Sequence, residues 1–171
     1  MSLAVVQQIL FAFFPVAMAW AAASDLITMT ISNKLSLALV AGFVALAPLS
    51  GMDLETFGLH VAVAAIVLAA TFGFFAAGWI GGGDAKFSAA VALWLGWSHA
   101  LDFLALSAVF GGVLTLIILT YRRALLPAFA LRQHWLARLY DKNAGVPYGV
   151  ALAAAALVVY PDTVWMRLAI G

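Results

Sequence analysis

The chain contains 171 residues, of which 67% are hydrophobic and only 9% are charged, and its mean hydropathy is +1.13. Soluble domains are about half apolar and about a quarter charged, and a chain this short leaves much of its surface exposed. The composition therefore excludes an ordinary soluble domain and predicts an integral membrane protein. The absence of cysteine excludes disulfides, thiolate metal sites and cysteine nucleophiles.

Six apolar runs approach the length of about 20 residues that a helix needs to cross a bilayer. No basic segment of a cleavable signal peptide precedes the first run, so we expect it to be retained as a span. The second, fourth and sixth runs are short and need flanking residues, a thinner bilayer or burial against neighbours. We predict an all-α membrane bundle of about six helices in one domain, residues 1–171, with five or seven spans as alternatives. The predicted spans are 3–24, 35–50, 56–79, 85–98, 100–121 and 147–161.

The distribution of charge predicts the orientation of these spans. If the N-terminus lies outside, the cytoplasmic loops hold every Lys and Arg except Arg167. The titratable residues of the outer loops are then Asp53, Glu55, His99 and Asp102, with no Lys or Arg. The positive-inside rule therefore places both termini outside. We interpret Asp53 and Glu55 as solvated charges, and Asp102 as an N-cap or dipole partner of the fifth span. The cytoplasmic basic residues are Lys34, Lys86, Arg122, Arg123, Arg132, Arg138 and Lys142.

The longest polar segment, residues 121–145, has the pattern of a basic amphipathic helix. Such a helix would lie in the anionic inner interface of the membrane, with Arg132 snorkelling from the apolar stripe. A solvated loop with a short helical stretch is the alternative. The apolar stripe consists of Leu125, Phe129, Leu136 and Leu139, and the opposite face holds Arg123, His134 and Arg138.

Two carboxylates, Asp25 and Asp84, differ from the other acidic residues in their position. Asp25 ends the first span and is followed by further apolar residues, and Asp84 begins the fourth span directly after three glycines. Both are expected at the cytoplasmic ends of helices, where an ionisable group faces a cavity or a partner rather than lipid. Two carboxylates facing one cavity share a proton, so one acts as base and the other as acid.

Each aspartate also has a structural interpretation. Asp84 would N-cap the fourth helix, with the preceding glycines ending the third helix in a left-handed conformation. Asp25 would be an interfacial cap or a partner of Lys34. Other chemistry is excluded by the motifs: Gly81 to Lys86 fits neither a phosphate-binding loop nor a dinucleotide fingerprint. The histidines lack metal-ligand spacing, so we expect no metal. We also expect no cofactor and no nucleic-acid partner.

Three segments together resemble the type IV prepilin peptidases, a group of GxGD intramembrane aspartyl proteases. Gly81-Gly82-Gly83-Asp84 is similar to the GxGD signature, and Lys86 extends it to GxGDxK. The segment from Asp25 to Asn33 resembles their Asp-x5-Ile-Pro-Asn segment, and Val146-Pro147-Tyr148-Gly149 resembles the start of their last helix. The segments follow the family's order, and the length of the chain resembles the short CpaA/TadV-like branch, which lacks the methyltransferase region.

The resemblance implies an aspartic endopeptidase of the bacterial inner membrane that removes the leader of Flp-type prepilins at the cytoplasmic face. It implies Asp25 and Asp84 as the catalytic pair, next to anionic lipid, without a covalent enzyme intermediate. The glycines would let a substrate backbone approach Asp84, and Lys86 would bias protonation, contact lipid phosphate or act as an interfacial anchor. The site-shaping residues would be Gly81, Gly83, Lys86, Asn33, Pro147, Tyr148 and Gly149.

Two positions depart from the family pattern. Ser32 replaces the usual proline, and we expect its hydroxyl to N-cap the second helix instead. Ile27 stands where many members carry a basic residue. Two other functions compete with a peptidase: a proton-coupled transporter using the two aspartates, and a non-catalytic subunit of a pilus or secretion assembly in which both aspartates are caps.

Overall fold

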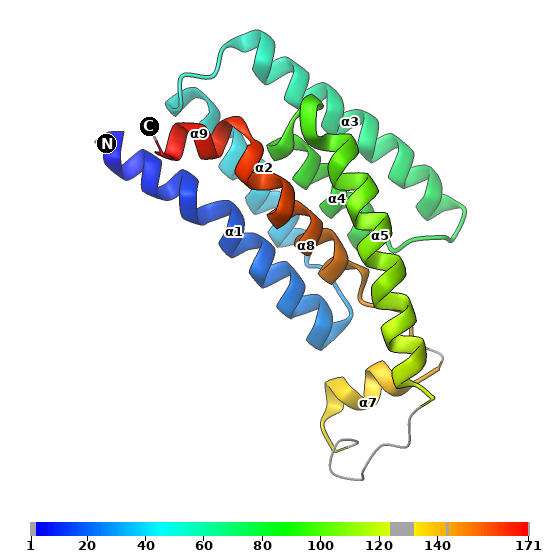
Figure 1. Ribbon diagram of the computed structural model, residues 1–171. Coiled ribbons are helices and arrows are strands. Elements are labelled where there is room, and N and C mark those ends of the chain that lie inside the picture. Colours follow the sequence, from blue (N-terminus) through cyan, green and yellow to red (C-terminus); the bar gives the residue numbers. More distant parts are fainter. Residues whose placement is uncertain (1–2, 124–131, 143, 171) are drawn as a thin grey trace.

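The computed structural model describes residues 3–123, 132–142 and 144–170. These residues are helical with no strand among them, which confirms the predicted all-α class. Figure 1 shows α7 projecting beyond one end of the bundle, while α9 and the beginning of α1 lie at the other end. The elements are α1 (Leu3–Thr28), α2 (Asn33–Leu49), α3 (Leu54–Ala76), α4 (Gly82–Leu95), α5 (Trp97–Tyr121), α7 (His134–Tyr140), α8 (Tyr148–Val159), η1 (Tyr160–Asp162) and α9 (Val164–Ile170).

Helix α4 is the central element, because α2, α3, α5 and α8 all pack against it. Every residue from Phe87 to Leu95 is buried, as expected for a helix that is apolar all round. At about 1.5 Å per residue the 14 residues of α4 span roughly 21 Å. Helix α8 is also short and largely buried, and it packs against α1, α4 and α5. The fourth and sixth predicted spans, which are short and correspond to α4 and α8, are thus covered by neighbouring helices.

The outer helices α3 and α5 have the opposite pattern. Both are long and apolar enough to cross a membrane, and only 22% of the most apolar stretch of each is buried. The other apolar helices among the described residues are shorter, so the count of six spans is not confirmed. Large apolar side chains are exposed along α3 and α5, among them Ile66, Phe72, Val109, Leu116 and Ile117.

An aromatic cluster closes the end of the bundle where α9 packs against α1. Trp94 of α4 lies 4.9 Å from Trp165 of α9, measured between ring centroids. The Trp94 Nε1–H donates to the Leu39 carbonyl oxygen at 2.9 Å, and the Trp165 Nε1–H donates to the Trp94 carbonyl oxygen at 2.6 Å. Both indole N–H groups are therefore satisfied although the rings are buried. This cluster fixes the C-terminal end of α4, opposite to Asp84.

Helix ends confirm one capping prediction and correct two others. Ser32 is the N-cap of α2, and its hydroxyl oxygen accepts the Lys34 N–H at 3.2 Å, as predicted. Gly96, not Asp102, is the N-cap of α5. Asp102 lies more than a turn inside that helix, exposed and 3.9 Å from His99 Nδ1, so its predicted role as an N-cap is wrong.

The second correction concerns the end of α3. Gly78, with a φ of +76°, takes the left-handed conformation there. The Trp79 N–H donates to the Phe74 carbonyl oxygen and the Gly78 N–H to that of Phe75, both at 2.9 Å, which is a Schellman motif. The interpretation in which the triple glycine forms this left-handed cap is therefore wrong.

The polar segment after α5 is described in part. Residues 134–140 form α7, in which Leu139 is buried while His134 and Arg138 are exposed, as the amphipathic pattern predicts. Leu125 and Phe129 lie outside the described residues, so the full length of the predicted amphipathic helix stays a prediction.

Candidate functional site

Four helix ends carrying most of the predicted site residues meet at one end of the bundle. They are the C-terminal end of α1 and the N-terminal ends of α2, α4 and α8, all on the side from which α7 projects (Figure 1). We call this the site end. Unsatisfied N–H groups and the helix dipole make each N-terminus favourable for negative charge. The site end therefore presents three such termini to the carboxylates of α1 and α4.

Asp25 is held by the first turn of α8. Its side chain is 4% exposed, and Oδ2 accepts the Gly149 N–H at 2.7 Å. A Cβ atom on Gly149 would lie 2.8 Å from this oxygen and 2.6 Å from Ile31 Cδ1, so glycine is required for the close approach. No salt bridge joins Asp25 to Lys34, which are both among the described residues, and the interpretation of Asp25 as a partner of Lys34 is wrong.

Asp84 lies on the first turn of α4, facing back toward its own N-cap. Gly81 is the N-cap, which corrects the interpretation of Asp84 as the cap residue. A Cβ atom on Gly81 would lie 2.9 Å from Asp84 Oδ2, so the Asp84 carboxylate lies directly against this N-cap residue. Ile31 packs against both Gly83, next to Asp84, and Gly149, the hydrogen-bond partner of Asp25. The structure thus brings together Asp25, Asp84 and the start of α8.

The glycines before Asp84 serve close packing rather than unusual backbone angles. Positive φ among the described glycines occurs at Gly51, Gly78 and Gly96, and not in the triple glycine. A Cβ on Gly83 would lie 3.3 Å from the Ile31 carbonyl oxygen. The first turn of α4 therefore lies directly against the segment that joins α1 to α2.

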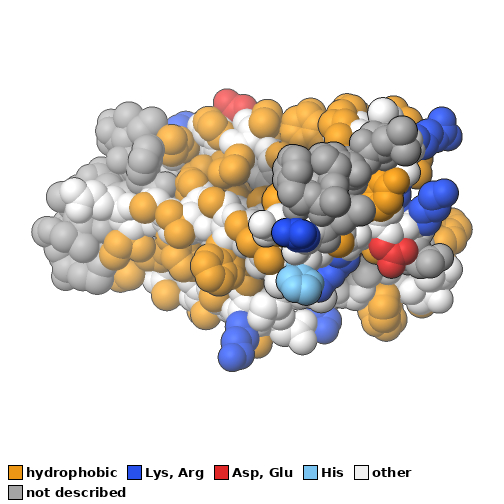
Figure 2. Space-filling view, turned by 90° about the horizontal axis from the view of Figure 1, so that it is seen from below, with side chains coloured by type: hydrophobic (Ala, Val, Ile, Leu, Met, Phe, Trp, Pro, Cys, Tyr) orange, Lys and Arg blue, Asp and Glu red, His pale blue; other side chains and the backbone are white. Residues whose placement is uncertain are grey.

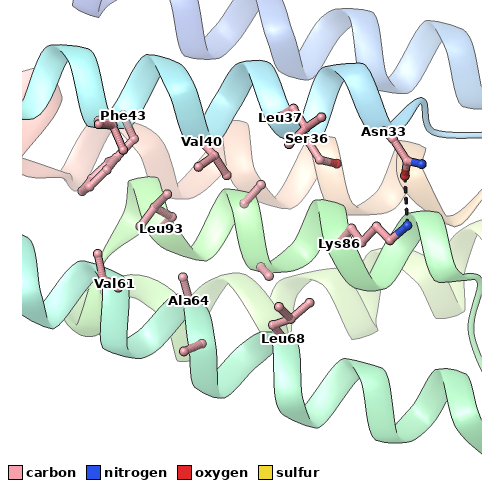
Figure 3. Close-up of a pocket in the computed structure, with 14 residues that line it drawn as sticks. Asn33, Ser36, Leu37, Val40, Phe43, Val61, Ala64, Leu68, Lys86 and Leu93 are labelled. Carbon is pink, nitrogen blue, oxygen red and sulfur yellow. Dashed lines mark hydrogen bonds between the residues drawn. The ribbon is translucent and has the colours of Figure 1, made fainter.

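Lys86 and Asn33 form a polar pair at the site end, separate from Asp25 and Asp84. The exposed Lys86 Nζ donates to Asn33 Oδ1 at 3.1 Å, linking α4 to α2 (Figure 3). The pair stands at one end of an apolar groove of about 630 Å³ between α2, α3 and α4. The hydrogen bond found for the Lys86 ammonium goes to Asn33 and not to either aspartate.

Pro147 and Tyr148 fix the start of α8. Pro147 is its buried N-cap residue, and the Tyr148 hydroxyl donates to the Ser107 carbonyl oxygen at 3.0 Å. The Tyr148 ring lies so close to Gly111 of α5 that a Cβ there would clash with it. These contacts anchor α8 on α5 and so position the Gly149 N–H.

One residue of this region was not singled out from the sequence. Arg122, grouped above only with the cytoplasmic basic residues, is 9% exposed and makes three hydrogen bonds to main-chain carbonyl groups. No local pattern distinguishes it from the adjacent Arg123, which is exposed. A third arginine, Arg138 of α7, donates to the Ile27 carbonyl oxygen of α1 at 3.2 Å.

The fold and the site define an all-helical, largely apolar protein with two aspartates at one end of the bundle. A model of the type IV leader peptidase family matches residues 12–116, which is more than half of the chain. The chain belongs to this family of membrane-associated peptidases, as its resemblance to the prepilin peptidases predicts. The match includes both aspartates and ends before α7 and α8. No curated protein and no solved structure matched the chain.

Proposed function

We propose that this protein is a membrane-embedded aspartic endopeptidase that removes the leader of a type IV, Flp-type prepilin at the cytoplasmic face of the bacterial inner membrane. The observation that carries the proposal is geometric: the buried Asp25, held by the first turn of α8, lies at the same end of the bundle as Asp84, and Ile31 packs against the first turns of both α4 and α8. Membership of the type IV leader peptidase family supports the same substrate class.

The proposed chemistry uses the two carboxyl groups as one acid–base pair. The ionised aspartate takes a proton from a water molecule as its oxygen attacks the peptide carbonyl carbon. The protonated aspartate donates its proton to the carbonyl oxygen, which gives a gem-diol. As the C–N bond breaks, the aspartate that took the proton from water passes it to the leaving amine, and the other aspartate takes back a proton from the gem-diol, so the pair is again singly protonated. The Gly149 N–H keeps Asp25 oriented during these transfers. No covalent bond to the enzyme forms.

The surface supports a position in the membrane. Exposed apolar side chains cover α3 and α5, and soluble proteins rarely expose contiguous apolar patches of such extent. Figure 2 shows Lys and Arg side chains at several places on the lower face, near the site end. Lys34, Lys86, Arg122 and Arg138 belong to helix ends on that side, whereas Arg167 belongs to α9. This distribution favours a cytoplasmic site end next to anionic lipid.

A transporter is the weaker candidate because of the depth of the carboxylates. Coupling sites of transporters lie near the bilayer midplane, often between repeats. Asp25 lies in the last turn of α1 and Asp84 in the first turn of α4, so both are at helix ends. In a purely structural subunit Asp25 would only satisfy the N-terminus of α8, and replacing either aspartate would leave leader removal intact, which the test below decides.

The test is cleavage of a prepilin by the purified protein in detergent micelles, where no ion gradient exists. Wild type is expected to release the leader, and Asp25→Asn and Asp84→Asn are expected to lose cleavage by at least about 100-fold while their yields hold. Asp102→Asn is the matched control, because this carboxylate is exposed and distant in the fold. Full cleavage by either dyad variant would refute the pair, and no cleavage by wild type would refute the peptidase.

A further inference from the structure

Arg122 joins the C-terminal end of α5 to the segment that leads into the site. Its Nε–H donates to the Leu139 carbonyl oxygen at 2.8 Å, near the end of α7. Its Nη2 donates to the carbonyl oxygens of Ala144 and Gly145, both at 2.8 Å. One side chain therefore holds both ends of the described connection between α7 and α8.

The carbonyl groups that Arg122 satisfies have a structural reason to need a donor. The last carbonyl groups of a helix lack intrahelical partners, and a cation is favourable beside them. A buried guanidinium is costly unless its N–H groups are hydrogen-bonded, and three such bonds are formed here. Arginine suits this position because its planar guanidinium reaches the end of α7 and the segment before α8 at once, which a lysine ammonium does not.

The segment that Arg122 holds ends at Gly145, four residues before Gly149, whose N–H orients Asp25. Gly145 is two residues from Pro147, the N-cap of α8, and the Gly149 N–H then donates to Asp25 Oδ2 at 2.7 Å. Tyr148 fixes the side of α8 against α5, but its hydrogen bond does not restrain the chain before Pro147. The Arg122 contacts therefore add a restraint on the chain before Pro147 that the Tyr148 contact does not supply.

We propose that Arg122 is a positioning residue for the Asp25–Asp84 pair, holding the α7–α8 connection so that α8 begins where the Gly149 N–H meets Asp25. The inference rests on the proposed peptidase function for its kinetic readout. The hydrogen bonds from Arg122 to Leu139, Ala144 and Gly145 do not depend on that function. Arg122 touches neither carboxylate in any hydrogen bond described above, so it acts through the backbone of α8.

The experiment compares Arg122→Gln and Arg122→Lys with Arg123→Gln, which removes an exposed arginine from the next position. Prepilin cleavage is measured in micelles with separate kcat and KM. Arg122→Gln is expected to lower kcat by about 10- to 100-fold, since small displacements of catalytic groups cost rates of this order. KM should change by less than about threefold, because no substrate contact is lost. Arg122→Lys should recover part of kcat, and Arg123→Gln should match wild type.

A second readout needs no activity. The chain contains no cysteine, so Ala144→Cys provides a single thiol in the held segment, where the carbonyl and not the side chain contacts Arg122. Its maleimide labelling is expected to rise about tenfold with Arg122→Gln, since losing about 1.4 kcal/mol of hydrogen bonding opens a segment tenfold more often. With Arg123→Gln it should not change.

The two readouts separate the possible failures. Unchanged labelling with Arg122→Gln would show that Arg122 does not hold the segment, and the inference would be overturned. Faster labelling with wild-type kcat would overturn the positioning role, as would equal losses of kcat in Arg122→Gln and Arg123→Gln. If wild type cleaves no prepilin, the proposed function fails, while the labelling still decides the hold. If Arg122→Gln does not accumulate, the same comparisons are made with Arg122→Lys.

Discussion

Replacing Gly149 with alanine tests how closely α8 must approach Asp25. The added Cβ would lie 2.8 Å from Asp25 Oδ2 and 2.6 Å from Ile31 Cδ1. Non-bonded carbon atoms settle near about 3.5 Å, whereas the added Cβ would lie only 3.0 Å from Asp25 Cγ, so the carboxyl group must retreat by roughly 0.5 Å or more. The hydrogen bond from the Gly149 N–H, now 2.7 Å, would then be broken or badly lengthened.

The expected loss follows from the strength of that hydrogen bond. A hydrogen bond to a charged group contributes about 1.5–3 kcal/mol. At about 1.36 kcal/mol per factor of ten, Gly149→Ala is expected to lower kcat by about 10- to 160-fold if the contribution is made in the transition state. The assay is prepilin cleavage in micelles with kcat and KM determined separately, and the yield checked by size-exclusion chromatography.

Gly112→Ala is the matched control, because a Cβ at that position of α5 meets nothing within 4 Å. Its kcat should equal that of wild type. A Gly149→Ala protein of normal yield whose kcat lies within about twofold of wild type would refute the reasoning. That result would mean that Asp25 works without the α8 hydrogen bond.

Three further predictions concern packing and the polar rim. Gly78→Ala should destabilise the protein by about 1 kcal/mol, because Gly78 has a φ of +76°. Gly73→Ala is the control and should not destabilise it, because a Cβ at this position of α3 meets open space. Thermal unfolding in detergent measures both variants. Trp94→Phe removes the donor to the Leu39 carbonyl oxygen and should cost about 1–3 kcal/mol in the same assay, with unchanged KM for prepilin; equal unfolding temperatures would contradict this. Lys86→Gln should alter kcat by less than about threefold, because Lys86 bonds to Asn33 at an exposed position, and a larger loss would assign Lys86 to the chemistry.

The sequence predicts the part of the site that depends on topology. Asp25 ends one apolar run and Asp84 begins another, so an antiparallel arrangement brings them to the same end whatever the details of packing. Ser32 as a cap was also predictable, because its hydroxyl acts on the N–H of Lys34, two residues away. Such local and topological relations need no knowledge of side-chain packing.

Other features depend on distant partners and were not predictable. Arg122 and Arg123 are equivalent in sequence, and only the placement of residues 139–145 makes the first a buried donor. Hydropathy likewise does not predict burial here, because α3 is the more apolar helix and yet mostly exposed, whereas α4 is buried from Phe87 to Leu95. The glycine that ends α3 was misassigned because Gly78 and the triple glycine lie close together and either can adopt positive φ.

The hydrogen bond between Asp25 and Gly149 also sets the order in which the protein is completed during synthesis. Its two partners are 124 positions apart. At about 5–20 residues per second, the ribosome needs roughly 6–25 s to add the residues between them. During that interval the carboxylate of the first helix lacks the N–H donor that orients it. A nascent chain therefore gains the donor that orients Asp25 only after the first turn of α8 has been synthesised.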